Sequence, residues 1–419
     1  MNAEIIAVGS ELLLGQITNT NATYISNQLS ELGINVYYHT VIGDNPTRLK
    51  QAIEIAERRA DLLIFSGGLG PTKDDLTKET IAQHLQAPLV FDEAALTHIE
   101  NYFAKRNMTM TKNNRKQALI IEGSEVLANH HGMAPGMLIA KGRHTYILLP
   151  GPPKELHPMF QYEAKPKLAA KLNENGIITS HVMRFYGIGE AALEDQLADI
   201  LEAQTNPTIA PLATDGEVTL RITAKAQTQQ QADVLIRAEV AKIQSRVGQY
   251  QYGINDDSLA SKLVEVLCAN ALTISAAESL TAGLFQSELA EIPGVGDALM
   301  GGFVTYTERA KIEQLGIDEK LIEQYGVVSK ECAVAMAKAV KAKLGTTIGV
   351  GLTGAAGPTA HAGQPVGTIW IAFVIGEQLY THQLQLSGMR NTNRIRTVKF
   401  AYHYILQALR ELGYNINKA

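Results

Sequence analysis

The sequence predicts an α/β protein with a mainly parallel sheet in its first domain, a small α+β unit in the middle and a three-layer α/β domain at the end. Three observations lead to this prediction. Strand and helix patterns alternate over residues 1–165, change to the order strand–helix–strand–strand–helix–strand over 166–252, and alternate again over 256–415. Such alternation is typical of parallel sheets covered by helices. A chain of 419 residues is long enough for these three domains.

In the first domain, each short apolar strand is followed by an amphipathic helix. Parallel sheets bind ligands in the loops at the carboxyl ends of their strands. Three such loops are candidates here: "VGSE" after the first strand, "SGGLGPTKDD" after the third, and "PGPPKE" near the end of the domain. The expected strands are 4–9, 34–43, 61–68 and 144–153, and the expected helices are 21–33, 47–60 and a segment after Asp75.

The middle segment predicts a ferredoxin-like unit. Residues 180–189 form a strand pattern and 190–202 a helix pattern, and a hairpin is expected over 208–226 around the turn pair Asp215–Gly216. A helix over 230–248 and a strand over 250–254 complete it. No dense polar cluster occurs here, so we interpret this unit as a spacer or dimerisation module.

The last domain begins near Asp256–Ser258 and again alternates strands with helices. The pattern ends in a hairpin and a closing helix, as an α/β domain with antiparallel edge strands would. Strands are expected at 272–279, 301–307 and 347–354, helices at 280–291 and 330–345, the hairpin at 367–386 and the closing helix at 393–413.

The composition is that of an ordinary globular protein. Hydrophobic residues make up 46% of the chain and charged residues 19%, and the formal net charge of −5 argues against a general nucleic-acid-binding protein. No apolar run approaches membrane-spanning length. Cys268 and Cys332 lie in apolar helical patterns without metal-type neighbours. We therefore expect a cytoplasmic protein with two reduced core thiols and no membrane or nucleic-acid partner.

The stretch "GGLGPTKDDLTKE", residues 67–79, allows two interpretations. Its glycines could turn their amides toward a phosphate at the start of a helix, and Asp74 and Asp75 could hold a cation such as Mg²⁺. Alternatively, Thr72 and Asp75 fit a capping box that only satisfies helix amides. The spacing alone gives the two interpretations equal weight.

A second group of polar residues follows strands of the last domain. Ser279 begins a helix, a position at which serine is most often an N-cap. Lys311 follows the next strand and Thr353 lies in a glycine-rich loop. A buried lysine can serve as the base for a serine nucleophile, and glycine-rich loops supply oxyanion donors. From the residues alone the cap is favoured, with Lys311 on the surface and Tyr306 as a half-buried strand aromatic.

The loop "GGLGPTKDDLT" resembles that of the molybdopterin-binding fold of the MoaB and MogA proteins. Together with "IIAVGSELLLGQITNTNATYIS", "NHHGMAPGM", "LLPGPPKEL" and "FYGIGEAALEDQL", it makes the whole chain similar to the CinA family of competence-damage inducible proteins. The resemblance implies ADP-ribose pyrophosphatase activity in the first domain, dependent on a divalent metal and a monovalent cation. It also implies a homodimer. The implied phosphate contacts are Gly67, Gly68, Gly70 and Thr72, with Asp75 as the metal or catalytic carboxylate and Asp74 and Glu11 as secondary metal candidates.

The last domain resembles the C-terminal CinA domain, which also occurs alone as the PncC enzymes. These hydrolyse the carboxamide of nicotinamide mononucleotide to nicotinic acid mononucleotide and ammonia, without a cofactor. The resemblance implies Ser279, Tyr306 and Lys311 as catalytic residues, and Thr281, Thr353, Gly354, Arg390 and Arg394 as substrate-binding residues. Either arginine could pair with the substrate phosphate, or both could be an exposed helix start.

Two positions depart from the family pattern. Gly296 stands where active members usually have a serine, and Met389 replaces the aspartate of Gly-Asp-Arg. If the missing serine carries catalysis, the pocket would bind a nucleotide without hydrolysing it. If Ser279 is the nucleophile, the change would affect only the rate.

Three functions are therefore open. The first is a two-site hydrolase of pyridine nucleotides. The second is a nucleotide- or partner-binding protein of the competence or DNA-damage response, with a degenerate deamidase pocket. Pterin binding ranks last, because a shared fold does not transfer a substrate.

Overall fold

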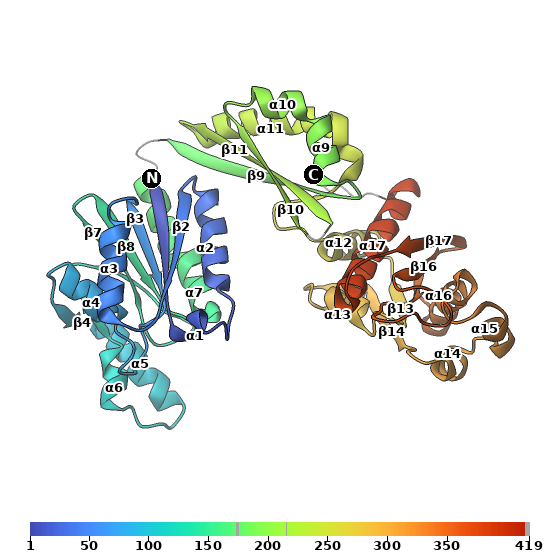
Figure 1. The fold of residues 1–419 in the computed structure, drawn as a ribbon, viewed down its shortest axis with the longest axis horizontal. Coiled ribbons are helices and arrows are strands. Elements are labelled where there is room, and N and C mark those ends of the chain that lie inside the picture. Colours follow the sequence, from blue (N-terminus) through green and yellow to red (C-terminus); the bar gives the residue numbers. More distant parts are fainter. Residues whose placement is uncertain (173–175, 215, 415–419) are drawn as a thin grey trace. The chain divides into compact units, whose positions relative to one another are not determined.

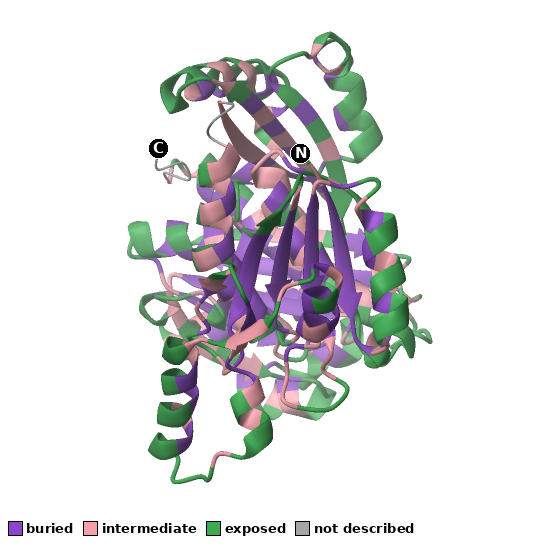
Figure 2. Cartoon of the chain, turned by 90° about the vertical axis from the view of Figure 1, so that its left-hand side faces the viewer, coloured by how far each residue is buried: buried purple, intermediate pink, exposed green. Residues whose placement is uncertain are grey.

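The N-terminal domain is built on a six-stranded sheet in the order β2–β1–β3–β8–β7–β6 (Figure 1). The first four of these strands are parallel, and β7 and β6 are antiparallel to their neighbours. The central strands β1, β3 and β8 are buried except at the first residue of β1 and of β8 (Figure 2), as expected for a sheet covered on both faces. The strands are β1 (Asn2–Val8), β2 (Asn35–Ile42), β3 (Leu62–Ser66), β6 (Glu125–Leu127), β7 (Gly136–Lys141) and β8 (His144–Leu149). The predicted parallel sheet is confirmed.

Helices cover this sheet on both faces. On one face, Ile53 and Ile81 pack against the sheet, and on the other Ile25 and Phe160 do so. Leu168 also belongs to the second core. The helices are α1 (Ser10–Leu13), α2 (Thr20–Glu31), α3 (Pro46–Ala56), α4 (Thr77–His84), α7 (Pro153–Met159), the π-helical turn η1 (Phe160–Ala164) and α8 (Lys165–Leu172).

A small helical insertion follows α4, and the sequence patterns did not predict it. It contains a two-stranded antiparallel sheet and two helices with a core of their own around Ile99 and Phe103. Its elements are β4 (Leu89–Phe91), α5 (Glu93–Lys105), α6 (Lys112–Lys116) and β5 (Leu119–Ile121).

The middle domain has a four-stranded sheet in the order β10–β11–β9–β12. This order confirms the predicted ferredoxin-like arrangement, although the first helix is divided in two at Leu197. Asp215, in the predicted turn, lies outside the described residues, which are 1–172, 176–214 and 216–414. The elements are β9 (Ile177–Tyr186), α9 (Glu190–Gln196), α10 (Ala198–Ala203), β10 (Thr208–Thr214), β11 (Glu217–Ala226), α11 (Gln229–Val247), the 3₁₀ turn η3 (Gly248–Tyr250) and β12 (Gln251–Ile254).

The C-terminal domain has a five-stranded sheet in the order β14–β13–β15–β16–β17. The first three strands are parallel and the last two are antiparallel. Helix α16 packs on one face, and α12, α13 and α17 pack on the other, which gives the predicted three layers. The elements are α12 (Leu259–Ala269), β13 (Ile274–Glu278), α13 (Leu284–Ala290), η4 (Val295–Asp297), β14 (Leu299–Val304), α14 (Glu308–Leu315), α15 (Glu319–Tyr325), α16 (Lys330–Leu344), β15 (Ile348–Gly354), β16 (Thr368–Ile375), β17 (Gln378–Gln385) and α17 (Arg390–Glu411).

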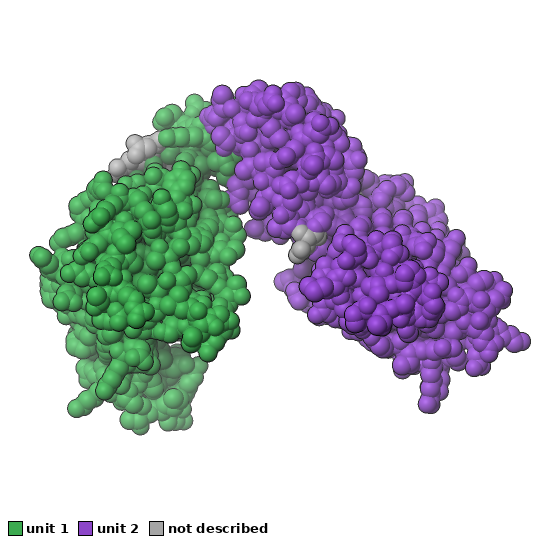
Figure 3. All heavy atoms as spheres, in the orientation of Figure 1, with its two compact units in different colours: residues 1–180, 223–237 green, residues 181–222, 238–419 purple. Residues whose placement is uncertain are grey.

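The chain divides into two units, residues 1–180 with 223–237 and residues 181–222 with 238–419, in this computed structural model (Figure 3). Among the described residues, no helix has the length and apolar character needed to cross a membrane. Both cysteines are free thiols. The prediction of two core thiols is wrong for one of them: Cys332 is buried, but Cys268 lies on the exposed face of α12.

Candidate active sites

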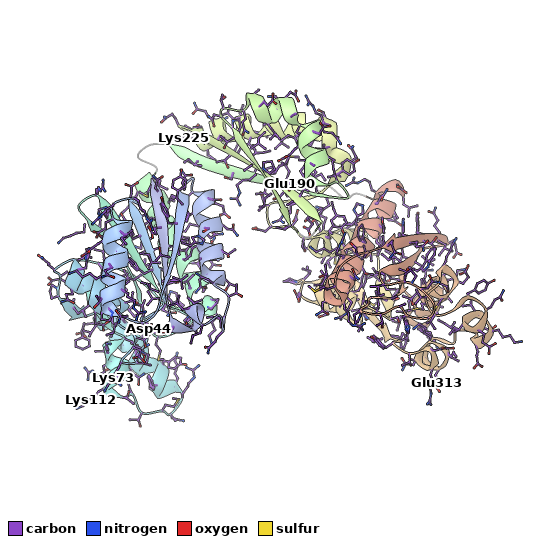
Figure 4. All side chains as sticks on the ribbon, in the orientation of Figure 1. Asp44, Lys73, Lys112, Glu190, Lys225 and Glu313 are labelled. Atoms are coloured by element: carbon purple, nitrogen blue, oxygen red, sulfur yellow. The ribbon has the colours of Figure 1, made fainter. Side chains whose placement is uncertain are left out.

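The N-terminal candidate site lies at the carboxyl edge of the parallel strands. The loops after β1, β2, β3 and β8 meet at this edge because these strands run in the same direction. The loop 67–76 joins β3 to α4, and Asp44, which follows β2, is visible at the same end of the sheet in Figure 4.

Two glycines let the loop 67–76 turn tightly against its neighbours. Gly67 and Gly68 have φ angles of 99° and 69°, a region that side chains disfavour. A Cβ on Gly67 would lie 2.2 Å from the carbonyl oxygen of Val8, and one on Gly68 would lie 2.0 Å from Thr77 Oγ1. The backbone of the loop therefore passes directly over the end of β1 and the start of α4.

The capping-box interpretation of Thr72 and Asp75 is wrong. Helix α4 begins at Thr77, and its N-cap, Leu76, provides no side-chain hydrogen bond. Instead, Asp75 Oδ2 accepts hydrogen bonds from the backbone nitrogen of Thr72 at 2.9 Å and from Thr72 Oγ1 at 2.6 Å. The same carboxylate covers Gly70, where a Cβ would be 2.5 Å from Oδ2. Asp75 therefore closes the glycine loop and does not cap the helix.

The predicted metal candidates do not form one cluster. Asp74 and Glu11 are exposed, and the Glu11 carboxylate lies against Gly9. Across the described part of the chain, no three His, Cys, Asp or Glu side chains form a group that could hold a metal. Asp44, which sequence reasoning missed, accepts hydrogen bonds from the backbone nitrogen and the hydroxyl of Ser10 at 3.1 and 2.8 Å. The sequence feature that could have identified Asp44 is an acidic residue shortly after a predicted strand, in "IGDN".

Two lysines that the sequence analysis did not identify lie beneath the loop 67–76. Lys78 is 1% exposed, and its Nζ donates to the carbonyl oxygen of Lys116 at 2.6 Å. Burial lowers the pKa of Lys78 to about 8. Lys116 Nζ donates to the carbonyl oxygen of Asp75 at 3.0 Å and pairs with Glu79 at 3.0 Å. Positive charge therefore lies next to the loop that was predicted to bind phosphate.

The C-terminal candidate site lies at the carboxyl edge of β13, β14 and β15. Ser279 directly follows β13, and Thr305 and Tyr306 directly follow β14. Because these strands are parallel neighbours, the segments that follow them meet at one edge. Thr307 then starts α14 by accepting a hydrogen bond from the backbone nitrogen of Ala310 at 3.1 Å, and α14 carries Lys311.

The helix after Ser279 is capped by Glu278, so the N-cap interpretation of Ser279 is wrong. Helix α13 begins only at Leu284. The fully buried Glu278 carboxylate accepts from the backbone nitrogens of Gly283, Phe285 and Gln286 at 2.9, 3.1 and 3.1 Å, and from Gln286 Nε2 at 2.9 Å. The hydroxyl of Ser279 is thus not needed by the helix.

Lys311 is buried and contacts Ser279. Its Nζ lies 3.1 Å from Ser279 Oγ and donates to the carbonyl oxygen of Thr305 at 2.8 Å. Lys311 is 1% exposed, so the alternative of a surface lysine is wrong. Burial lowers the pKa of Lys311 below its ordinary value, which favours the neutral amine.

The two predicted arginines begin α17, as expected, but both reach back into the site. Arg390 donates to the hydroxyl of Tyr306 and, at 2.6 Å, to the carbonyl oxygen of Gly357. Arg394 donates to the carbonyl oxygens of Leu280 and Thr281 at 3.1 and 2.9 Å. Tyr306 itself is 52% exposed, so the Arg390–Tyr306 pair is accessible to a ligand.

Thr353 and Gly354 make local contacts instead of contacts with Ser279 or Lys311. Thr353 Oγ1 donates to the carbonyl oxygen of Val327 at 2.6 Å. Gly354 packs so closely that a Cβ would lie 2.8 Å from the carbonyl oxygen of Thr368. By contrast, the hydroxyls of Thr281 and Thr305 are buried and have no hydrogen-bond partner among the described residues. Thr305 was not predicted as a site residue.

In the folded chain, Gly296 lies far in space from the Ser279–Lys311 pair. It is an exposed residue of η4, which precedes β14, whereas Ser279 follows β13. Since β13 and β14 are parallel, these positions lie at opposite edges of the sheet, separated by a six-residue strand of about 20 Å. The departure at Gly296 therefore leaves this pair intact.

Comparison with known proteins assigns all three domains. Residues 4–170 match the model "Probable molybdopterin binding domain", 180–253 match "Damage-inducible protein CinA KH domain", and 256–409 match "CinA C-terminal domain". A competence-damage inducible protein of Lysinibacillus sphaericus is 73% identical over 415 residues, covering 99% of both chains. The Bacillus subtilis protein of the same name is 53% identical over 409 residues, covering 98% of both.

Solved structures also match part of the chain. The structure of a CinA protein from Thermoplasma acidophilum is 37% identical and covers 40% of this chain and 97% of that chain, with a TM-score of 0.37. The full-length identity to the curated relatives and the three domain matches decide the assignment. The chain belongs to the CinA family of competence-damage inducible proteins.

Proposed function

We propose that the C-terminal site is an amidohydrolase that converts nicotinamide mononucleotide and water to nicotinic acid mononucleotide and ammonia. The observation that supports this most strongly is the 3.1 Å contact between Lys311 Nζ and Ser279 Oγ in a buried environment. A lysine whose pKa is lowered by burial can be neutral and act as a base toward an adjacent hydroxyl.

In this proposal Lys311 carries the proton through both halves of the reaction. Ser279 Oγ forms a bond to the carboxamide carbon while its proton passes to Lys311 Nζ. The carbon–nitrogen bond then breaks, and Lys311 returns the proton to the departing nitrogen, which leaves as ammonia. Water attacks the resulting ester by the same route: its proton passes to Lys311 and then to Ser279 as the carboxylic acid leaves. The carbonyl oxygen of Thr305 holds Nζ in place at 2.8 Å throughout.

Arg390 is the better of the two arginines for the phosphate of the mononucleotide. It is exposed, and its known contacts are with the hydroxyl of Tyr306 and one backbone carbonyl. A guanidinium has five N–H donors in a planar fork, so two such contacts leave donors for a phosphate. Tyr306 would then line the substrate entrance beside Arg390.

The test is ammonia release from nicotinamide mononucleotide by the full chain in the presence of a chelator. We expect turnover by the wild type and a loss of at least about 10³-fold in Ser279→Ala, since a nucleophile has been removed. Ser287→Ala is the matched control, because Ser287 is exposed on α13 and should leave the rate unchanged. Equal rates in the wild type and Ser279→Ala would contradict the proposal, and no turnover by the wild type would favour a competence-linked binding protein.

We further propose that the N-terminal site cleaves the pyrophosphate of ADP-ribose. The supporting observation is a glycine loop closed by Asp75 and flanked by Lys78 and Lys116. The donor set suits a divalent cation such as Mg²⁺, which usually takes one or two carboxylates, here Asp75 with Asp74, and leaves positions for water and phosphate. When bound, such a cation would neutralise charge on the pyrophosphate. The proposal also includes a monovalent cation at this site. It further places the protein in the cytoplasm as a homodimer. Formation of AMP from ADP-ribose, with and without added metal, tests it.

A further inference from the structure

We propose that the backbone N–H groups of Leu280 and Thr281 form the oxyanion hole of the C-terminal site, and that Arg394 is the positioning residue that aims the Thr281 N–H. This inference rests on the amidohydrolase proposed above. It replaces the expectation that Arg394 pairs with the substrate phosphate.

The hydrogen bonds of the segment after Ser279 single out two N–H groups. The backbone nitrogen of Ser279 donates to Leu352, that of Ala282 to Ser279, and that of Gly283 to the Glu278 carboxylate. The nitrogens of Leu280 and Thr281 have no acceptor among the described residues, although these residues are only 4% and 0% exposed. Buried N–H groups are almost always paired, so two consecutive unpaired ones beside a nucleophile require an explanation.

Arg394 fixes the peptide group that carries the Thr281 N–H, whose carbonyl is that of Leu280. The Leu280 N–H belongs to the preceding peptide group, whose Ser279 carbonyl accepts from the nitrogen of Ala282. Arg394 Nε donates to the carbonyl oxygen of Leu280 at 3.1 Å and its Nη2 to that of Thr281 at 2.9 Å. In a planar trans peptide the C=O and N–H point in opposite directions. Holding the Leu280 carbonyl toward Arg394 therefore turns the Thr281 N–H away from Arg394. Asn391 Oδ1 accepts from Nη1 at 3.1 Å and keeps the guanidinium in this orientation.

The position of the two N–H groups suits the chemistry. In serine hydrolases, the N–H of the residue after the nucleophile commonly stabilises the oxyanion, and Leu280 is that residue here. Attack by Ser279 Oγ places negative charge on the former carboxamide oxygen, and fixed N–H dipoles in a water-poor site stabilise this charge strongly. Glu278 contributes by pairing the N–H groups of residues 283, 285 and 286, so these donors do not compete with those of Leu280 and Thr281 for the oxyanion.

Removal of Arg394 should therefore affect the chemical step and not substrate binding. Loss of one oxyanion donor typically lowers kcat by 10²–10³-fold. For Arg394→Ala we expect a decrease of about 10²-fold in kcat with KM changed less than about threefold, both for nicotinamide mononucleotide and for nicotinamide riboside, which lacks the phosphate. Arg394→Lys should recover part of kcat, since a lysine keeps one donor. Arg309→Ala, an exposed arginine paired with Glu313 on α14, is the control and should match the wild type.

A phosphate-binding arginine would behave differently. Arg394→Ala would then raise KM for the mononucleotide and leave the riboside unaffected, and this result would overturn the proposal.

A structural measurement tests the inference even if the protein releases no ammonia. We would determine a crystal structure of the full wild-type chain with pyridine-3-boronic acid, whose boron forms a tetrahedral adduct with an active serine oxygen. The expected result is an adduct on Ser279 Oγ with one boron-bound oxygen within hydrogen-bond distance of the nitrogens of Leu280 and Thr281. An adduct whose oxygens face away from both nitrogens, or no adduct at Ser279, would overturn the inference. Absence of turnover together with the expected adduct would overturn only the deamidase function.

Discussion

Each candidate site contains one buried lysine, and the two lysines differ in what their amines contact. Lys78 and Lys311 are both 1% exposed, and burial lowers the pKa of each. Lys78 Nζ donates to a backbone carbonyl, that of Lys116. Lys311 Nζ contacts a backbone carbonyl and, in addition, the hydroxyl of Ser279.

The difference shows why a lowered lysine pKa is not by itself a sign of catalysis. Both lysines pay for burial, but only Lys311 has a group beside it that could give up a proton. Lys78 instead contacts Lys116, whose amine donates to the carbonyl oxygen of Asp75 in the glycine loop. We therefore interpret Lys311 as a base and Lys78 as a support.

The largest expected effect is the loss of one of the two activities when a residue of only one site is changed. Asp75→Asn should lower AMP formation from ADP-ribose by about 10²–10⁴-fold, because it removes the charge that would hold the cation or act in catalysis. Ammonia release from nicotinamide mononucleotide should be unchanged, since Asp75 belongs to the other unit. Parallel assays of both activities on the same preparation test this. A matching loss of both activities would mean that the sites do not act independently.

The second prediction concerns how burial of the Lys78 amine lowers the free energy of unfolding. Its folded pKa of about 8 lies below the ordinary value of 10.5, so between these values the unfolded chain binds more protons than the folded one. The free energy of unfolding should therefore rise with pH from about 8 toward 10.5, by about 3 kcal/mol from this residue. Urea denaturation of the wild type and Lys78→Met at pH 7.5 and 9.5 measures it.

In Lys78→Met the rise between these two pH values should be smaller, because the titrating amine is absent. Lys112→Met is a suitable control, since Lys112 is exposed at the start of α6. An identical rise in Lys78→Met and the wild type would show that Lys78 is not the group responsible.

The third prediction concerns the Glu278 cap. Glu278→Gln keeps the size of the side chain but replaces one accepting oxygen by an amide NH2 group, which can only donate, so the N–H groups bound to that oxygen at the start of α13 lose their acceptor. We expect the free energy of unfolding to fall by about 2 kcal/mol, the range for hydrogen bonds to charged groups. Thermal or urea denaturation checks this. Glu288→Gln, on the same helix, should change stability less, and the reverse order would contradict the capping role.

The smallest predicted effect is the pH dependence of ammonia release. Lys311 must be neutral to accept the proton of Ser279, so kcat/KM should rise tenfold per pH unit below the pKa of Lys311 and level off above it. Because burial lowers that pKa, the plateau should begin below the ordinary lysine value of 10.5. A rate that falls as pH rises over this range would contradict a basic role for Lys311.

The fold was largely predictable because its strands and helices carry strong local patterns. Buried parallel strands such as "LLIFS" are continuous apolar runs, and the predicted domain boundary near Ser258 is where α12 begins. The insertion around Ile99 was not predicted, although Leu96, Ile99 and Phe103 recur at helical spacing along α5.

The site was predictable in its residues but not in its contacts. Resemblance to the family identified Ser279 and Lys311, yet a local pattern favoured Ser279 as a cap because serine usually has that role. The actual cap is Glu278, one residue earlier. Its carboxylate accepts from N–H groups beyond a turn, and α13 begins only at Leu284. Burial of Lys311 also depends on packing of α14 against α16 in the core that includes Leu315 and Met336, which a single sequence does not reveal.

The most direct test of the Ser279–Lys311 pair is to measure ammonia release by the wild type and Lys311→Met side by side, with Lys320→Met as an exposed control. We predict that Lys311→Met loses at least about 10³-fold in kcat, which is within the range for a positioned general base, and remains folded or becomes more stable because a buried amine is replaced by an apolar side chain. A folded Lys311→Met protein that releases ammonia at the wild-type rate would contradict the account.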